Sequence, residues 1–84
     1  MGYAVEMLRP AEKTLDKLAR QQPADAERIE DAIEALAEEP RPAGCKPLTG
    51  YPHVYRVRVG NYRICYTIND RELVVLVVTV STRR

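Results

Sequence analysis

The chain has 84 residues, enough for one small domain but too few for two hydrophobic cores. Its two cysteines, Cys45 and Cys65, are too few for a disulfide scaffold and lack the spacing of metal ligands, so we expect reduced thiols and no metal. We see no secretion signal and no apolar run near the roughly 18 residues of a membrane span, and we therefore expect a cytoplasmic protein.

The net charge of +1 hides an uneven distribution along the chain. Residues 1–42 carry six Lys and Arg against ten Asp and Glu, whereas residues 43–84 carry seven against two. This asymmetry predicts one surface suited to a polyanion and another that repels it. The alternative is a scatter of charges without functional meaning.

The first half of the chain predicts a strand and two helices. Residues 3–8 alternate loosely and end just before Pro10, which suits a short strand. Apolar residues at helical spacing predict helices over 10–20 and 23–39, each starting at a proline. The acidic residues of the second helix are typical of a solvated face, and we assign them no chemistry.

The second half predicts a loop and then three strands. Residues 40–53 hold four of the six prolines and should form the loop, and strands should follow at 54–59, 62–69 and 73–80. Gly60-Asn61 is typical of a two-residue hairpin turn. We therefore expect an α+β fold over a single domain, residues 1–84: a strand, a two-helix hairpin and a three-stranded antiparallel meander, with the helices on one face of the sheet.

The hairpin register sorts side chains onto two faces. If Gly60 and Asn61 form the turn, Val59 pairs with Tyr62 and Arg58 with Arg63. The apolar face, expected against the helices, then holds Tyr55, Val57, Val59, Tyr62, Ile64, Tyr66 and Ile68. The other face holds Arg56, Arg58, Arg63, Cys65 and Thr67.

The three arginines of that second face predict an anion site. Like charges directly opposite each other destabilise a sheet, so Arg58 facing Arg63 is a local conflict that a phosphate or carboxylate would relieve. The alternative is that the arginines splay into solvent. The last strand is apolar on both faces, so a partner should cover its second face, expected to hold Val74, Leu76, Val78 and Val80.

Residues 55–66 (YRVRVGNYRICY) resemble the RelE/ParE toxin superfamily, whose members carry a Tyr-basic-x-basic strand, a short turn and a Tyr-Arg-x-x-Tyr strand. The resemblance extends over nearly the whole chain. Residues 48–50 look like the family's Leu-x-Gly element, and residues 77–83 look like its final strand and arginine. The basic-x-basic spacing looks more like RelE than like the ParE gyrase poisons.

The resemblance implies a RelE-like toxin of a toxin–antitoxin pair that inhibits translation. Such enzymes cleave mRNA in the ribosomal A site, beside the 16S rRNA, by attack of a ribose 2′-hydroxyl on the adjacent phosphate. Its implied partners are mRNA on the ribosome and a cognate RelB-like antitoxin, with no metal and no small-molecule cofactor. By position, the implied catalytic residues are Arg56, Arg58, Arg63 and Arg83.

Further residues have weaker claims on RNA or on proton transfer. We expect Lys46, Tyr51 and Arg84 to bind RNA, Tyr51 by stacking on a base, although packing explains that tyrosine equally well. His53 is a candidate for proton transfer, but a lone loop histidine is ordinarily a surface residue. Cys65 lies beside the arginines and is expected to be a packed or half-covered thiol, not a nucleophile.

The family usually places a catalytic tyrosine several residues beyond the arginine that Arg83 matches, and the sequence ends before it. Either a tail is missing or cleavage proceeds without that residue, and we expect weakened activity. Two other interpretations compete with the nuclease on the same fold: a ParE-like, non-enzymatic inhibitor of DNA gyrase, and an inactive member that only binds an antitoxin.

Overall fold

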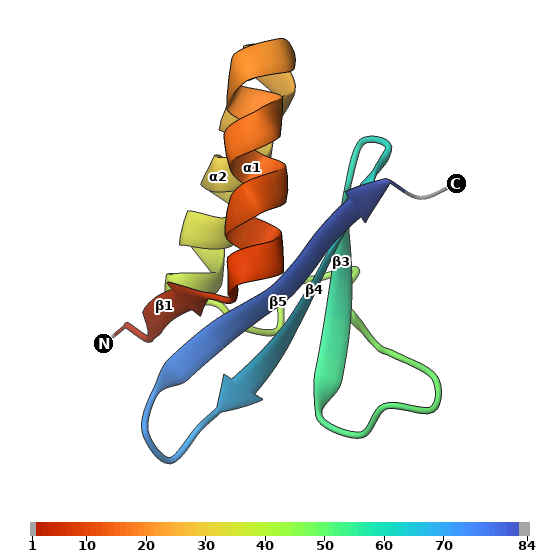
Figure 1. Ribbon diagram of the computed structural model, residues 1–84. Coiled ribbons are helices and arrows are strands. Elements are labelled where there is room, and N and C mark those ends of the chain that lie inside the picture. Colours follow the sequence, from red (N-terminus) through yellow and green to blue (C-terminus); the bar gives the residue numbers. More distant parts are fainter. Residues whose placement is uncertain (1, 83–84) are drawn as a thin grey trace.

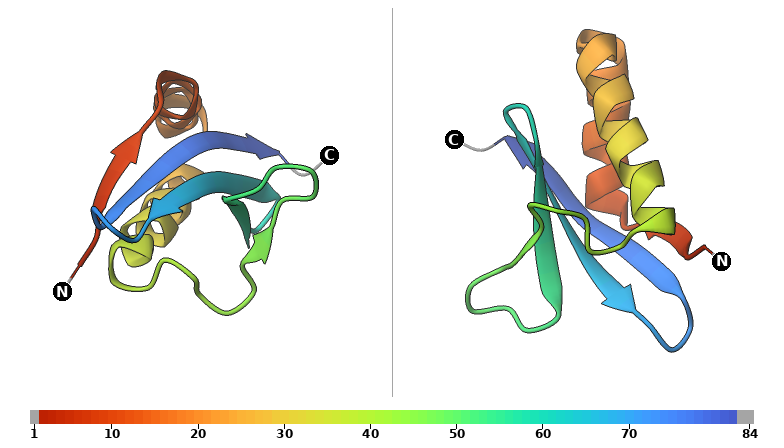
Figure 2. Two further views of the ribbon diagram at one scale, coloured as in Figure 1. Left: turned by 90° about the horizontal axis from the view of Figure 1, so that it is seen from below. Right: turned by 180° about the vertical axis from the view of Figure 1, so that it is seen from behind.

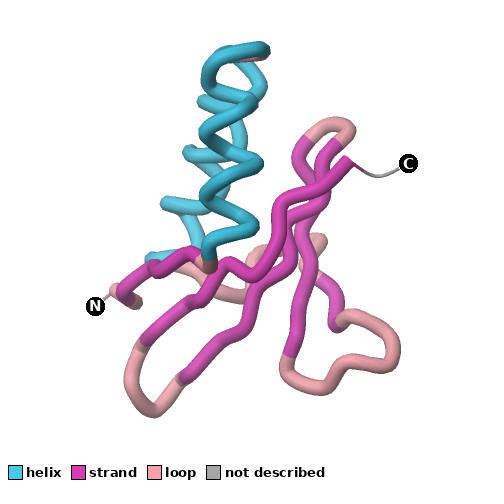
Figure 3. Tube along the Cα trace, in the orientation of Figure 1, coloured by secondary structure: helices cyan, strands magenta, loops and turns pink. Residues whose placement is uncertain are grey.

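The structure is a computed structural model that describes residues 2–82. Its seven elements follow in the order β1 (Ala4–Met7), α1 (Arg9–Gln21), α2 (Pro23–Glu38), β2 (Lys46–Pro47), β3 (Val54–Val59), β4 (Tyr62–Asn69) and β5 (Val74–Thr82). Figures 1 and 3 show how the helices and the longer strands are arranged. The predicted α+β fold is confirmed. The predicted bounds of the two helices differ from the observed ones by no more than one residue at each end.

The strands form one five-stranded sheet in the order β1-β5-β4-β3-β2. β1 runs parallel to β5, and all other neighbours are antiparallel. Figures 1 and 2 show α1 and α2 as an upright pair near the β1–β5 end of the sheet, whereas β3 and β2 lie at the other end. The helices therefore leave the opposite face of the sheet uncovered, and we call this face the open face.

The hydrophobic core lies between α2 and the sheet. Ile29, Ile33 and Leu36 of α2 recur at helical spacing and are almost fully buried against the sheet residues Ile64, Tyr66, Val75, Val77 and Val80. α1 contacts α2 and β5, and its Ala11 is fully buried. Each large apolar side chain buried here contributes about 1.5–3 kcal/mol to stability, so Ile29, Ile33 and Leu36 make α2 a major part of the core.

The β3–β4 hairpin has the predicted register. Val59 lies opposite Tyr62, Arg58 opposite Arg63, and Arg56 opposite Cys65. Gly60 has a φ of 58°, whereas Asn61 is not among the residues with positive φ. Glycine with positive φ at the first central position is the mark of a type II′ turn, which fits the right-handed twist of the two strands.

A β-bulge between β4 and β5 overturns part of the prediction for the last strand. Cys65 pairs with Thr79 but Tyr66 pairs with Val77, so Val78 is an extra residue in β5. The bulge reverses the alternation, and Val80 is buried in the core at 4% exposure. Placing Val80 on the open face with Val74, Leu76 and Val78 was therefore wrong.

The start of β5 and the loop before β3 also differ from the prediction. β5 begins at Val74, because Leu73 has a φ of 59° in the preceding turn, and it continues to Thr82. The predicted loop 40–53 contains the short strand β2, in which Lys46 lies opposite Arg56 and Pro47 opposite Tyr55. Proline is tolerated there because β2 is an edge strand.

Candidate functional site

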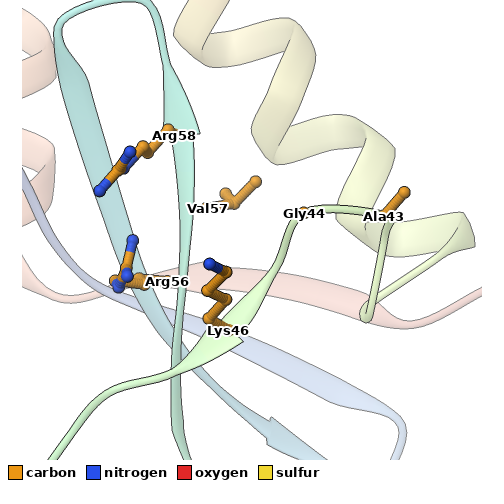
Figure 4. Close-up of a pocket in the computed structure, with 6 residues that line it drawn as sticks. All are labelled: Ala43, Gly44, Lys46, Arg56, Val57 and Arg58. Carbon is orange, nitrogen blue, oxygen red and sulfur yellow. The ribbon is translucent and has the colours of Figure 1, made fainter.

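The basic side chains of β3 and β4 lie on the open face of the sheet, away from the helices. Figure 4 shows Arg56 and Arg58 on one side of β3 and Val57 on the other, as the alternation of a strand requires. Arg63 of β4 is directly opposite Arg58, in the same register position. Three arginines from two strands therefore share one face.

A hollow of about 330 Å³ lies where β3 meets the preceding loop and β2. We call it the basic hollow; its lining residues are Ala43, Gly44, Lys46, Arg56, Val57 and Arg58. The pairing of β2 with β3 places Lys46 opposite Arg56. Three of the six lining side chains are thus cationic, and they come from two different strands.

Three of the four cations of this face form no ion pair with an acidic side chain in the described part of the chain. The ion pairs formed within residues 2–82 are Arg28–Asp25 and Arg41–Asp70, and neither involves Lys46, Arg56 or Arg63. The Nε of Arg63 is buried and has no hydrogen-bond partner in that part of the chain. Buried charged groups normally find partners, so this arrangement is suited to a phosphate or carboxylate supplied from outside.

The other residues that the sequence singled out lie apart from the hollow or outside the described residues. Tyr51 is 62% exposed in the turn before β3, and His53 is an exposed turn residue with a φ of 69°; neither lines the hollow. Cys65 is a free, buried thiol opposite Arg56, in agreement with the prediction of a packed cysteine. Arg83 and Arg84 lie outside the described residues.

The loop residues Ala43 and Gly44 complete the hollow, and the sequence did not single them out. Gly44 has a φ of 90°, a conformation that favours glycine, and this lets the chain turn toward β2. The Pro-Ala-Gly segment indicated a turn, but its approach to Val57 depends on tertiary contacts alone.

A polar network joins the start of this loop to the β4–β5 turn. The guanidinium of Arg41 donates hydrogen bonds to both carboxylate oxygens of Asp70, at 3.2 and 2.9 Å. The hydroxyl of Tyr3 donates to the same carboxylate at 2.7 Å. Two hydrogen-bonding partners, Arg41 with the larger effect and Tyr3 with the smaller one, lower the pKa of Asp70 to about 2.

Two stacked tyrosines continue this network into the core. The Arg41 guanidinium lies 5.4 Å from the centroid of the Tyr55 ring, and Tyr55 stacks on Tyr66 at 6.1 Å. The hydroxyl of the fully buried Tyr66 donates to the carbonyl of Pro40 at 2.8 Å, and burial raises the pKa of Tyr66. The loop is thus attached to the sheet at residues 40 and 41.

The structure holds no cluster of metal ligands in residues 2–82, where no three His, Cys, Asp or Glu side chains gather. Nor does any helix of that part of the chain have the length and apolar character needed to cross a membrane. The open face itself presents four cationic side chains that suit an anion, those of Lys46, Arg56, Arg58 and Arg63.

Several solved structures similar to this chain are toxins or toxin–antitoxin complexes. The chain is 27% identical to a chain in the archaeal RelE–RelB complex from Pyrococcus horikoshii OT3, with a TM-score of 0.83 and coverage of 99% of this chain and 97% of that one. It is 26% identical to a chain in the E. coli RelBE toxin–antitoxin complex, with a TM-score of 0.81 and 98% of both chains covered. The YoeB/ParE toxin from Agrobacterium tumefaciens shares the fold, with a TM-score of 0.84, at 16% identity over 96% of this chain and 99% of that one.

Sequence comparison gives the family. No curated protein matches the chain. Residues 5–84, however, match the model of the family described as the ParE toxin of type II toxin-antitoxin system, parDE. Since that match covers almost the whole chain and the fold agrees, the chain belongs to the ParE toxin family, within the RelE/ParE superfamily of type II toxins.

Proposed function

We propose that this toxin is an endoribonuclease that cleaves mRNA in the ribosomal A site and so inhibits translation in the cytoplasm. The observation that carries the proposal is the group of Lys46, Arg56, Arg58 and Arg63 on the open face of the sheet. Three of these cations have no acidic partner within residues 2–82. RNA offers the closely spaced phosphates that such a surface attracts.

The arginines would act on the scissile phosphate. The 2′-hydroxyl oxygen attacks the adjacent phosphorus and gives up its proton to water. The bond from phosphorus to the 5′ oxygen of the next nucleotide breaks, that oxygen takes up a proton from water and leaves as a 5′-hydroxyl, and a 2′,3′-cyclic phosphate remains. Arginine stays protonated, with a pKa above about 12, so Arg56, Arg58 and Arg63 would not accept the proton of the hydroxyl. Their proposed work is to hold the phosphate and to stabilise the negative charge that develops on it, which is worth about 3–4 kcal/mol per well-placed donor in other enzymes.

Further parts of the proposal concern residues and partners around this centre. Lys46 would contact a neighbouring phosphate, and Tyr51, which is exposed beside β3, would stack on a base. A catalytic role for Arg83 and RNA binding by Arg84 remain predictions. No metal and no cofactor enters the proposed reaction.

The proposed protein partner is a RelB-like antitoxin. Similar toxins occur in complexes with RelB in Pyrococcus horikoshii and E. coli. In this chain Val74 and Leu76 alternate with the core residues Val75 and Val77. Val74 and Leu76 are half-buried and lie on the open face. An antitoxin segment that covers this strip would remove apolar surface from water and would lie near the cationic face.

The test is primer extension on a defined mRNA with and without programmed ribosomes, with the parent toxin and Arg63→Ala. We expect cuts that need the ribosome and that disappear in the variant, while its thermal unfolding stays close to that of the parent. Parent and Arg63→Ala cutting alike would contradict the assigned role of the arginine. If the parent cuts no mRNA, two interpretations remain: inhibition of DNA gyrase, or an inactive member of the family that only binds an antitoxin.

The second candidate is inhibition of DNA gyrase. It is favoured by one observation, the match of residues 5–84 to the ParE toxin family. A gyrase supercoiling assay run beside the primer extension separates the two candidates. Inhibition of supercoiling without mRNA cleavage would replace the nuclease by the gyrase inhibitor.

A further inference from the structure

The wall of the basic hollow belongs to a loop that is held mainly at its two ends. The loop leaves α2 after Glu38, and its far end is β2, whose Lys46 lies opposite Arg56. Between these ends, Ala43 and Gly44 are exposed, and a Cβ built on Gly44 would meet no atom within 4 Å. One backbone hydrogen bond, from the N–H of Cys45 to the carbonyl of Pro42 at 3.0 Å, closes a turn inside the loop.

At its first end the loop is attached to Asp70, a residue far from the hollow in sequence. Asp70, in the β4–β5 turn, accepts hydrogen bonds from Arg41 at 3.2 and 2.9 Å and from Tyr3 at 2.7 Å. The turn itself is braced, since the N–H of Glu72 donates to the Asn69 side chain at 2.9 Å. Asp70 therefore offers Arg41 a fixed anchor.

The same arginine also touches the strand that carries the cations. Its guanidinium lies over Tyr55, and Tyr55 is opposite Pro47 in β2 and directly precedes Arg56 in β3. A planar guanidinium held by a two-oxygen contact and a ring face has little freedom of orientation. The backbone at Arg41 is thereby placed relative to β2 and β3 before the loop turns toward the hollow.

We infer that Arg41 and Asp70 are positioning residues for the basic hollow: together they set the course of residues 42–45, and so the places of Gly44 and Lys46 relative to Arg56. Neither residue lines the hollow. The inference rests on the proposed function in that the anion received by the hollow is taken to be RNA.

The energetics separate this role from a general contribution to stability. Both side chains are about half exposed, and exposed ion pairs contribute little to the free energy of unfolding. A contact that fixes the path of a loop instead changes how well its ligand groups are arranged before binding. Loss of the anchor should therefore weaken RNA binding more clearly than it lowers the melting temperature.

The chain offers a matched control in an element other than the loop. Asp25 also accepts a hydrogen bond from a tyrosine, Tyr62, at 2.9 Å, and it also pairs with an arginine, Arg28, at 3.9 Å. Asp25 lies in the first turn of α2, away from residues 40–47. Asp25→Asn removes the same charge in similar surroundings without touching the loop.

The experiment measures binding of a fluorescein-labelled oligouridylate by anisotropy at low salt for the parent, Asp70→Asn, Arg41→Gln and Asp25→Asn. We expect the first two variants to bind roughly threefold to tenfold more weakly, the lower part of the range for residues coupled in one network. Amide exchange at Cys45 should become faster in both. Asp25→Asn should change neither the affinity nor that exchange rate.

A double-mutant cycle with Lys46→Ala tests whether the anchor acts through the loop. If it does, Asp70→Asn should cost little affinity once Lys46 is already gone, whereas Asp25→Asn should behave the same in both backgrounds. Additive losses, or an unchanged affinity in Asp70→Asn, would overturn the inference.

One further variant separates failure of the inference from failure of the proposed function. Arg56→Gln should weaken the parent's RNA binding whatever the anchor does. If Arg56→Gln weakens binding and Asp70→Asn does not, only the inference fails. If the parent does not bind RNA, or Arg56→Gln binds as the parent does, the proposed RNA site is wrong and the inference fails with it.

Discussion

Replacing Arg63 by methionine should make the free toxin more stable while it weakens RNA binding. Methionine matches the arginine side chain in length as far as Nε, with a sulfur in place of Cδ, and it places a methyl group where the buried, unpartnered Nε now stands. It also removes one of the two positive charges that face each other at Arg58 and Arg63. The variant therefore removes two unfavourable features of the unliganded fold at once.

The size of the effect follows from these two features. Like charges directly opposite in a sheet cost about 0.2–1 kcal/mol. An unsatisfied buried donor costs about 1–3 kcal/mol when it is isolated from water, and the half-buried setting of Arg63 reduces that figure. We take a net gain of about 1 kcal/mol, which corresponds to a rise in melting temperature of about 4–8 °C for a domain of this size.

The assay is thermal unfolding of the purified toxin without RNA or antitoxin, beside anisotropy with labelled RNA. Arg71→Met is the control, because Arg71 is exposed in the β4–β5 turn and its replacement makes the same change in net charge. It should leave both the melting temperature and the affinity unchanged. If Arg63→Met melts several degrees below the parent, Arg63 is a packing residue and the argument from opposed charges is refuted.

Three other variants test the parts of the fold that position the site. Gly60→Ala should lower the free energy of unfolding by about 1–2 kcal/mol, measured by denaturant titration, because the residue has a φ of 58° and an added Cβ would lie 3.0 Å from Nη2 of Arg28; Asn61→Ala, beside it in the turn, should cost less. Tyr66→Phe should cost about 1–2 kcal/mol in the same assay, since the Pro40 carbonyl loses its buried donor, and an unchanged midpoint would contradict this. Asp70→Asn should lower the free energy of unfolding relative to the parent by its largest amount at pH values above about 4, the pKa of Asp70 in the unfolded chain. The difference should shrink as the pH falls toward 2, because the pKa of Asp70 in the folded protein lies near 2. A difference that stays constant over that range would count against the Arg41 contact.

Local patterns in the sequence predicted the elements that depend on short-range chemistry. Proline at the start of each helix, apolar residues at helical spacing and a Gly-Asn turn were enough for α1, α2 and the β3–β4 hairpin. The same register predicted that Arg58 would face Arg63. These features could be read because each depends on neighbours within a few residues along the chain.

The features that could not be predicted depend on contacts across long sequence distances. The bulge at Val78 has no local mark in a run of valines and leucines, and it decides which side of the sheet receives Val80. The short strand β2 has no alternating pattern, and its pairing with β3 brings Lys46 opposite Arg56 at the hollow. The contact of Arg41 with Asp70 joins residues 29 positions apart, and neither residue carries a signal of its partner.

The net charge of +1 is a poor guide to how this toxin meets an anion, because the fold separates the two signs of charge in space. The exposed carboxylates of α2, such as Glu30 and Glu34, lie near the β1–β5 end of the sheet, whereas the basic hollow lies at the β3–β2 end. A polyanion would be repelled from the first end and attracted to the second, so under the proposed function it should approach already oriented toward the open face. Because that attraction would come from a few cations, among them Lys46, Arg56 and Arg63, binding should weaken steeply with salt, as it does for far more basic proteins.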